Sequence, residues 1–188
     1  NNPEVINSVN EEGYSPLILA CYKSNNLVAK FLIEKVKNIN GSSAMGTPLM
    51  AAVVKQNIDV VKLLLENKAD PSIADVNGTT ALIYACERGY LEIAKLLVQA
   101  GADLDIIDYP KYTALTYACK NGHIEIVKLL MAAGAGINLL QKGKSSLIVA
   151  SEKGHLEIVK LLVEAEAKHI EATTPVKATP KQTRGKKQ

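Results

Sequence analysis

Apolar and polar positions repeat along this chain with a period of 32 or 33 residues. The segment 80–98 returns with few changes as 113–131. A fixed period of this length is typical of a stack of small units, each of which contacts its neighbours. Every unit opens with a hydroxyl residue and carries an apolar pair sixteen residues later. The five opening residues are Ser15, Thr47, Thr80, Thr113 and Ser145.

The pattern within one unit predicts two short helices joined by a tight turn. The opening hydroxyl suits the N-cap, where it accepts a hydrogen bond from a free backbone N–H. In the third unit we expect the first helix to end near Gly89 and the second to span 91–100. Leu96 is expected in the core, so that Leu96→Ala costs about 2 to 5 kcal/mol. Stacking is required because such short helices are marginal alone.

These motifs resemble the ankyrin repeat. Residues 75–85 read Asp-Val-Asn-Gly-Thr-Thr-Ala-Leu-Ile-Tyr-Ala, which is similar to the family's opening pattern Asp-x-x-Gly-x-Thr-Pro-Leu-His-x-Ala. Residues 122–130 match its second half, Gly-His-x-Glu-Ile-Val-x-Leu-Leu, and the match recurs in phase over roughly residues 5–170. The resemblance implies an all-α ankyrin-repeat solenoid of about five helix-turn-helix units with β-turn fingers.

The domain organisation that we predict is a repeat domain over 1–172 followed by a basic tail. Residues 1–9 are interpreted as the remnant of a preceding unit. Glu166 replaces the glycine that stops earlier second helices, so the last helix is expected to continue. The predicted units lie near 10–41, 42–74, 75–107, 108–139 and 140–172.

The composition changes abruptly at Thr173. The tail 173–188 holds five cations and no acid, with little apolar content, so we expect it to be disordered alone. The formal net charge of the chain is +3, so removing the five tail cations leaves −2 for residues 1–172. The tail is interpreted either as a solubilising end or as an arm that contacts a polyanion. Its candidate contacts are Lys177, Lys181, Arg184, Lys186 and Lys187.

The cysteines and two of the histidines, which could act in catalysis or metal binding, recur at fixed positions of the repeat. Cys21, Cys86 and Cys119 share one position in their units, which favours reduced core thiols over a disulfide or metal site. His123 and His155 also share a position, and a structural hydrogen bond is the preferred interpretation. We recognise no catalytic, zinc or phosphate-binding motif. The chain is therefore predicted not to be an enzyme, with no cofactor, metal or small-molecule substrate.

The sequence constrains localisation only weakly. It contains no apolar run long enough to cross a membrane, and no membrane partner is expected. Nothing at Asn1 resembles a signal peptide, yet the first residue is not Met. The cytoplasm is favoured, and a removed leader stays an alternative.

Positions that differ between units are free to recognise a partner. The resemblance implies docking on the concave face, formed by the fingertips and the exposed side of the first helices. The finger 109–112 favours binding because it puts two tyrosines and a cation at a loop tip. Tyr84 and Tyr117 either extend this patch or pack between units. The candidates are Tyr14, Tyr84, Arg88, Tyr109, Lys111, Tyr112, Tyr117, Lys142 and Lys144.

Two main hypotheses for function follow. The first is a non-catalytic protein–protein interaction module that binds a partner protein or peptide, and the lysines suggest an acidic one. The alternative is a structural subunit of a nucleoprotein or other large assembly, in which the tail contacts nucleic acid or another acidic surface. A third reading is a targeting fragment of a larger enzyme.

Overall fold

The computed structural model describes residues 5–43, 46–137 and 145–167 in full, and the backbone of 168–173. Over these ranges it contains ten α-helices and a short 3-10 helix, η1 (Val5–Asn7). The first helices of the five units are α1 (Pro16–Tyr22), α3 (Pro48–Val54), α5 (Ala81–Arg88), α7 (Ala114–Asn121) and α9 (Ser146–Glu152). The second helices are α2 (Asn26–Ile33), α4 (Ile58–Glu66), α6 (Leu91–Gln99), α8 (Ile124–Ala132) and α10 (Leu156–Thr173).

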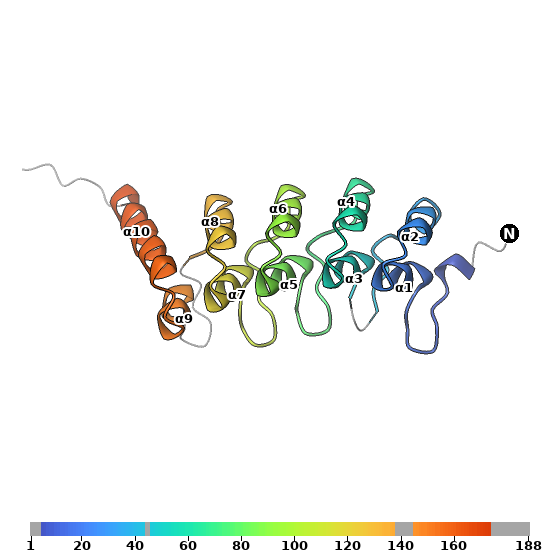
Figure 1. The fold of residues 1–188 in the computed structure, drawn as a ribbon, viewed down its shortest axis with the longest axis horizontal. Coiled ribbons are helices and arrows are strands. Elements are labelled where there is room, and N and C mark those ends of the chain that lie inside the picture. The colour runs from blue at the N-terminus through green and yellow to red at the C-terminus, as the bar shows by residue number, and fades with distance from the viewer. Residues whose placement is uncertain (1–4, 44–45, 138–144, 174–188) are drawn as a thin grey trace, which may run out of the picture.

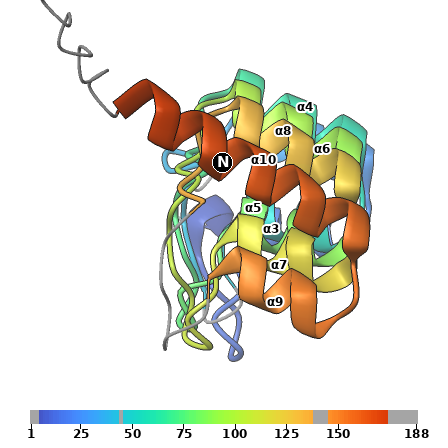
Figure 2. The same cartoon turned by 90° about the vertical axis from the view of Figure 1, so that its left-hand side faces the viewer.

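The helices form two layers (Figure 1). The first helices make the lower row, the second helices make the upper row, and the loops between units hang below. Figure 2 looks along the stack and shows the units in register, with their loops projecting on one side. We call each projecting loop a finger. In the described part of the fingers, β-bridges are limited to the isolated pairs Ser43–Gly46 and Ala74–Thr80. The predicted all-α solenoid is confirmed.

Hydroxyl side chains start the first helices as predicted. The Oγ1 atom of Thr80 accepts a hydrogen bond from the backbone N–H of Ile83 at 3.2 Å. Such a cap typically stabilises a helix by about 1 kcal/mol. The same arrangement recurs at Ser15, Thr47, Thr113 and Ser145.

The turn between the two helices of a unit requires a left-handed residue. Gly89 and Gly122 supply it with φ of 77° and 76°. Ser24 and Gln56 take the same place in the first two units, with φ of 56° and 53°. The turn is therefore conserved in shape through the stack although glycine is absent from two of the units, at a modest cost in backbone strain.

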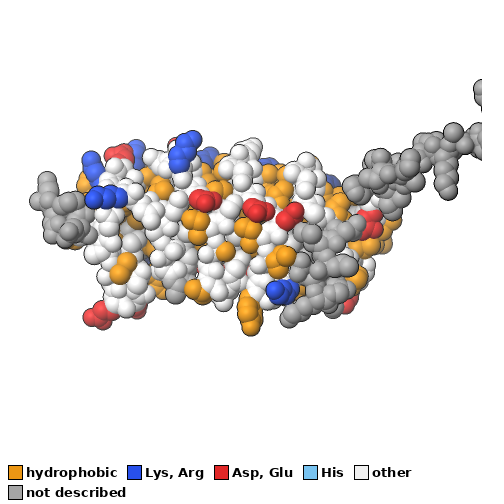
Figure 3. Space-filling view, turned by 180° about the vertical axis from the view of Figure 1, so that it is seen from behind, with side chains coloured by type: hydrophobic (Ala, Val, Ile, Leu, Met, Phe, Trp, Pro, Cys, Tyr) orange, Lys and Arg blue, Asp and Glu red, His pale blue; other side chains and the backbone are white. Residues whose placement is uncertain are grey.

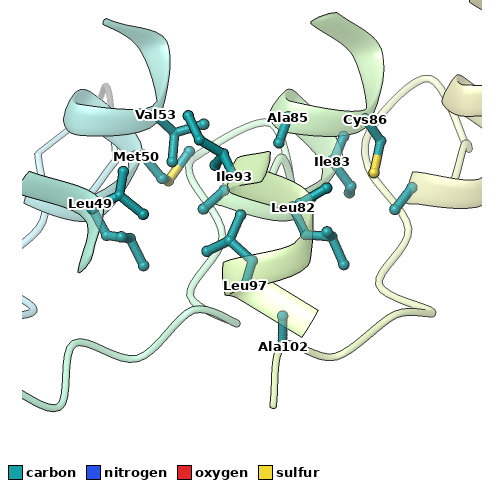
Figure 4. Close-up of a cluster of buried hydrophobic side chains, with 14 of the residues drawn as sticks. Leu49, Met50, Val53, Leu82, Ile83, Ala85, Cys86, Ile93, Leu97 and Ala102 are labelled. Atoms are coloured by element: carbon teal, nitrogen blue, oxygen red, sulfur yellow. The ribbon is translucent and has the colours of Figure 1, made fainter. Parts of the chain in front are cut away.

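The apolar core lies between the two layers and continues from unit to unit. Figure 4 shows Leu82 and Ile83 of α5 in one cluster with Ile93 and Leu97 of α6. Leu97 is fully buried, whereas Leu96 is only half-buried. The prediction that Leu96 is a central core residue was wrong. The buried residues Ile93, Ala94 and Leu97 define the inward face of α6, and Leu96 lies at its edge, partly buried against the core.

Polar groups join neighbouring units. The Nε2 atom of His123 lies 3.3 Å from the carbonyl oxygen of Glu87, and that of His155 lies 3.1 Å from the carbonyl oxygen of Lys120. The structural hydrogen bonds expected of these two histidines are confirmed. Asn121 adds a second bond at the first of these joints, because its Nδ2 donates to the same Glu87 oxygen at 2.9 Å.

The last second helix is the longest of the described helices. It runs for 18 residues, whereas α6 and α8 end after nine. Gly101 and Gly134 follow those two helices with φ of 82° and 91°, and Glu166 stands at the matching place in α10. The backbone therefore stays helical through Glu166, as predicted.

Candidate functional site

Side chains from the fingers and the first helices share one surface. Glu12 and Tyr14 of the first finger line the same hollow as Leu19 and Tyr22 of α1. In the fourth unit, Lys120 of α7 lies over the ring of Tyr112, which belongs to the finger. We call this shared surface the inner surface. It combines fingers and first helices, the two elements from which the resemblance implies a docking face.

A row of cations follows the inner surface from unit to unit. Each cation lies at or next to the C-terminal end of a first helix, where the partial negative charge of the free carbonyls favours a positive side chain. Glu87 and Glu152 are the acidic residues at the neighbouring positions. The members of this cation row are Lys23, Lys55, Arg88, Lys120 and Lys153.

Tyrosine rings hold the cations of the middle units. The Nζ atom of Lys55 lies 4.0 Å from the ring centroid of Tyr22, which belongs to the preceding unit. The Cζ atom of Arg88 lies 5.2 Å from the ring centroid of Tyr84. These separations are within the range of about 6 Å for a cation–π contact. Together with the contact of Lys120 in the fourth unit, these contacts restrict three long side chains, which reduces the entropy that these side chains would lose on binding.

The fourth unit uses two rings for one cation. The Nζ atom of Lys120 lies 5.3 Å from the ring centroid of Tyr112 and 5.5 Å from that of Tyr117. The two rings meet edge to face, with centroids 5.4 Å apart and planes at 84°. Tyr112 therefore contributes its ring to the inner surface through a fixed orientation.

Tyr117 packs within the fold, which is one of the two readings that the sequence left open for it. Its side chain is 8% exposed. Its hydroxyl donates a hydrogen bond of 2.7 Å to Oδ2 of Asp108, a buried carboxylate. Burial is the largest cause that raises the pKa of Tyr117, and the hydrogen bond to Asp108 raises this pKa further. The hydroxyl therefore keeps its proton and satisfies Asp108.

The tip of the fourth finger is open to solvent. Tyr109 is 82% exposed, and its backbone N–H donates to the carbonyl oxygen of Asn77 in the third finger at 2.7 Å. Val76, at the matching position of the third finger, is 75% exposed. Lys111 is exposed as well and has a left-handed backbone, with φ of 71°. Two linked fingertips thus offer apolar side chains beside a cation.

The remaining candidates differ in what the structure describes of them. Tyr14 is half-buried, and its backbone N–H donates to Oδ1 of Asn10 at 2.8 Å. Lys142 and Lys144 lie outside the described residues, as do the predicted tail contacts Lys177, Lys181, Arg184, Lys186 and Lys187.

A hollow of about 240 Å³ lies on the inner surface between the first two units. Leu19, Tyr22, Ala51 and Val54 provide its apolar lining. This hollow was not predicted from the sequence, although the alignment of the units contains a signal for it. Ala51 stands where the third and fourth units carry tyrosine, so a ring is missing there.

Seen from behind, on the side where the fingers project, the molecule carries acidic and basic side chains in separate places (Figure 3). Acidic side chains form a short row across its middle, and basic ones lie mainly along its upper edge. Elsewhere, on the second helices, lysines pair with glutamates one turn earlier. Lys95 lies 2.7 Å from Glu92, and Lys128 lies 2.8 Å from Glu125. These exposed pairs stabilise the helices only slightly.

The buried thiols have the environment of core residues. Cys21, Cys86 and Cys119 are free and fully buried. Burial raises the pKa of Cys21 and Cys119 to about 12 and raises that of Cys86 as well. The thiols therefore stay protonated in the folded chain, which makes them weak nucleophiles.

Two searches of the described residues gave negative results. In the described part of the chain, His, Cys, Asp and Glu side chains form no group of three or more that could hold a metal ion. No described helix combines the length and the apolar character needed to cross a membrane.

Comparison with known proteins places the chain in a family. The family model for ankyrin repeats (3 copies) matches residues 2–75, 46–108 and 105–174. A putative E3 ubiquitin-protein ligase of Arabidopsis thaliana, XBAT34, is 38% identical over 104 residues, which cover 48% of this chain and 28% of the ligase. BCL-6 corepressor-like protein 1 of Homo sapiens is 36% identical over 80 residues, or 42% of this chain and 4% of that protein.

A third relative carries the repeat in its name. Ankyrin repeat and SAM domain-containing protein 6 of Rattus norvegicus is 37% identical over 82 residues, which cover 43% of this chain and 9% of that protein. The chain thus spans less than a third of the length of each of these relatives. Repeats of this kind are generally protein–protein interaction modules and are typically non-catalytic. With the family model matching almost its whole length, the chain belongs to the ankyrin-repeat family.

Proposed function

We propose that the inner surface binds an extended, acidic segment of a partner protein, and that binding rather than catalysis is the activity of these repeats. The observation that carries the proposal is the cation row with its tyrosines. Lys55, Arg88 and Lys120 each lie over a tyrosine ring in three successive units.

Charge supports an acidic partner. The cation row sets five positive side chains against the carboxylates of Glu87 and Glu152. Residues 1–172 carry −2 overall, so the positive charge of this row is local. A local positive surface attracts acidic partners and suppresses binding of basic ones.

The regular spacing of the cations supports an extended partner segment. The cations recur once per unit, and packed helices lie about 8 to 10 Å apart, which an extended chain spans in about three residues. The exposed fingertips at Val76 and Tyr109 add apolar contact area beside the row. Aromatic and arginine side chains are frequent anchors at interfaces, because they bury much area for little lost rotamer freedom.

The test compares two variants with equal loss of charge. In the first, Lys55, Arg88 and Lys120 are all replaced by glutamine. In the control, the second-helix residues Lys62, Lys95 and Lys128 are replaced by glutamine. Binding of a fluorescent glutamate-rich peptide is measured by anisotropy at two salt concentrations, with a lysine-rich peptide as the negative probe.

We expect the inner-surface variant to lose most of the binding and the control to keep it. Binding by the unchanged chain should weaken with salt, because the contacts are charged and solvent-exposed. Equal losses in the two variants would mean that only net charge matters, and the proposed surface would be wrong. Binding of the lysine-rich peptide at similar strength would contradict it too.

A further inference from the structure

We infer that the hollow between the first two units binds an aromatic side chain of the acidic segment described above. The inference rests on the proposed function and adds an anchor and a register to it. Its starting point is the position in the repeat that Leu19, Ala51, Tyr84 and Tyr117 share.

The hollow exists because the second unit lacks a ring at this position. Tyr84 and Tyr117 stand at this position in the third and fourth units, whereas the second unit has Ala51, which lines the hollow and has no ring. Val54 keeps the floor apolar, although Glu87 and Lys120 occupy its position in the next two units. The lining that α1 and α3 contribute at Leu19, Ala51 and Val54 is therefore apolar.

The protein itself shows what such a space accepts. In the third unit the ring of Tyr84 lies under Arg88, four residues further on, at 5.2 Å. In the second unit Lys55 is four residues after Ala51 and lies 4.0 Å from the ring of Tyr22. A partner's ring in the hollow would thus meet the edge or face of Tyr22 and the ammonium group of Lys55.

The size of the hollow suits a single side chain better than a drug-sized ligand. The hollow measures about 240 Å³, below the range of about 300 to 1,000 Å³ typical of sites for drug-sized ligands. It is also partly open to solvent at Glu12 and Lys23, so the chain that carries the ring can leave along the surface.

The charges around the hollow determine towards which units the partner's acidic segment extends. Glu11 and Glu12 of the first finger are exposed and repel acidic residues on the N-terminal side of the hollow. Arg88 and Lys120 attract them on the other side. With about three extended residues per unit, acidic residues are expected about three and about six positions from the ring.

The experiment uses synthetic peptides of this design and the full 188-residue chain. One peptide carries phenylalanine at its N-terminal end followed by acidic residues at these spacings, and a second reverses the order, since both chain directions fit the surface. Each is compared with a peptide that has alanine in place of phenylalanine. Affinities are measured by fluorescence anisotropy.

Two variants close the hollow without changing charge. Ala51→Tyr and Leu19→Tyr both introduce the residue that the third and fourth units carry at this position. Ala51→Ser is the matched control, because it keeps the hollow open. Circular dichroism and thermal unfolding establish that each variant folds, and the two filling variants serve as independent checks on each other.

We expect phenylalanine to improve the affinity of one peptide about ten-fold or more, as for a buried interface anchor. Ala51→Tyr or Leu19→Tyr should remove that advantage, and Ala51→Ser should retain it. Phenylalanine without effect in both peptides, or an advantage that survives both filling variants, would overturn the inference. The proposed function is judged separately, by whether the alanine peptides still depend on Lys55, Arg88 and Lys120.

Discussion

At the scale of single residues, burial within each second helix decides which leucine holds the array together. Leu97 is fully buried between the layers, and Leu96 is half-buried at the side of the helix. Leu97→Ala is therefore expected to lower the free energy of unfolding by about 2 to 5 kcal/mol, because it removes apolar contacts and leaves a cavity. Leu96→Ala should cost clearly less. Urea unfolding followed by circular dichroism measures both.

The comparison of these two leucines has a built-in control. They are adjacent and identical in type, so helix propensity and unfolded-state effects cancel between the variants. A larger loss for Leu96→Ala than for Leu97→Ala would contradict the packing described for α6.

At the scale of elements, the fingers keep the same backbone conformation at one position although the residue there changes. Gly13 and Gly78 have φ of 82° and 75°, and Lys111 adopts 71° at the same position of the fourth finger. A side chain in this region costs roughly 1 to 2 kcal/mol. Lys111→Gly is thus expected to raise the free energy of unfolding by up to about 1 kcal/mol, the larger unfolded-state entropy of glycine offsetting the rest.

Chemical denaturation of Lys111→Gly beside Lys111→Ala tests this reasoning. Alanine removes the same charge and keeps the strained side chain, so it should bring no comparable gain. An equal gain from both substitutions would assign the effect to charge instead of backbone strain.

The elements were largely predictable from the sequence, whereas the inner surface was predictable only in part. The hydroxyl caps and turn glycines are local signals, and they placed the helices correctly because each acts within one turn. Tyr117 was ambiguous because its burial depends on Asp108, nine residues earlier, whose carboxylate points back to it. The hollow at Ala51 is lined by residues of two neighbouring units, so it could not be predicted from the pattern of either unit alone.

At the scale of the whole molecule, a stack in which each unit contacts only its neighbours should open from its ends. The three buried thiols report on this, since Cys21 lies in the first unit, Cys86 in the third and Cys119 in the fourth. In the 188-residue chain the first unit has a neighbour on one side in the described structure. Cys21 is therefore expected to react first with an alkylating reagent, Cys119, one unit from the other end, next, and the central Cys86 last.

Pulsed alkylation followed by peptide mass spectrometry measures the three rates in mild denaturant. Burial raises the pKa of Cys21 and Cys119 from the ordinary value of 9.0 to about 12, so the folded state favours the neutral thiols. The contribution of the neutral, buried thiols to the free energy of unfolding is complete below about pH 9. It is lost as the pH rises towards 12, because between these values the thiols ionise only in the unfolded chain. Labelling should accordingly accelerate above pH 9 by more than the thiolate fraction of a free cysteine explains. One common rate for all three thiols would instead show that the array opens as a single cooperative unit.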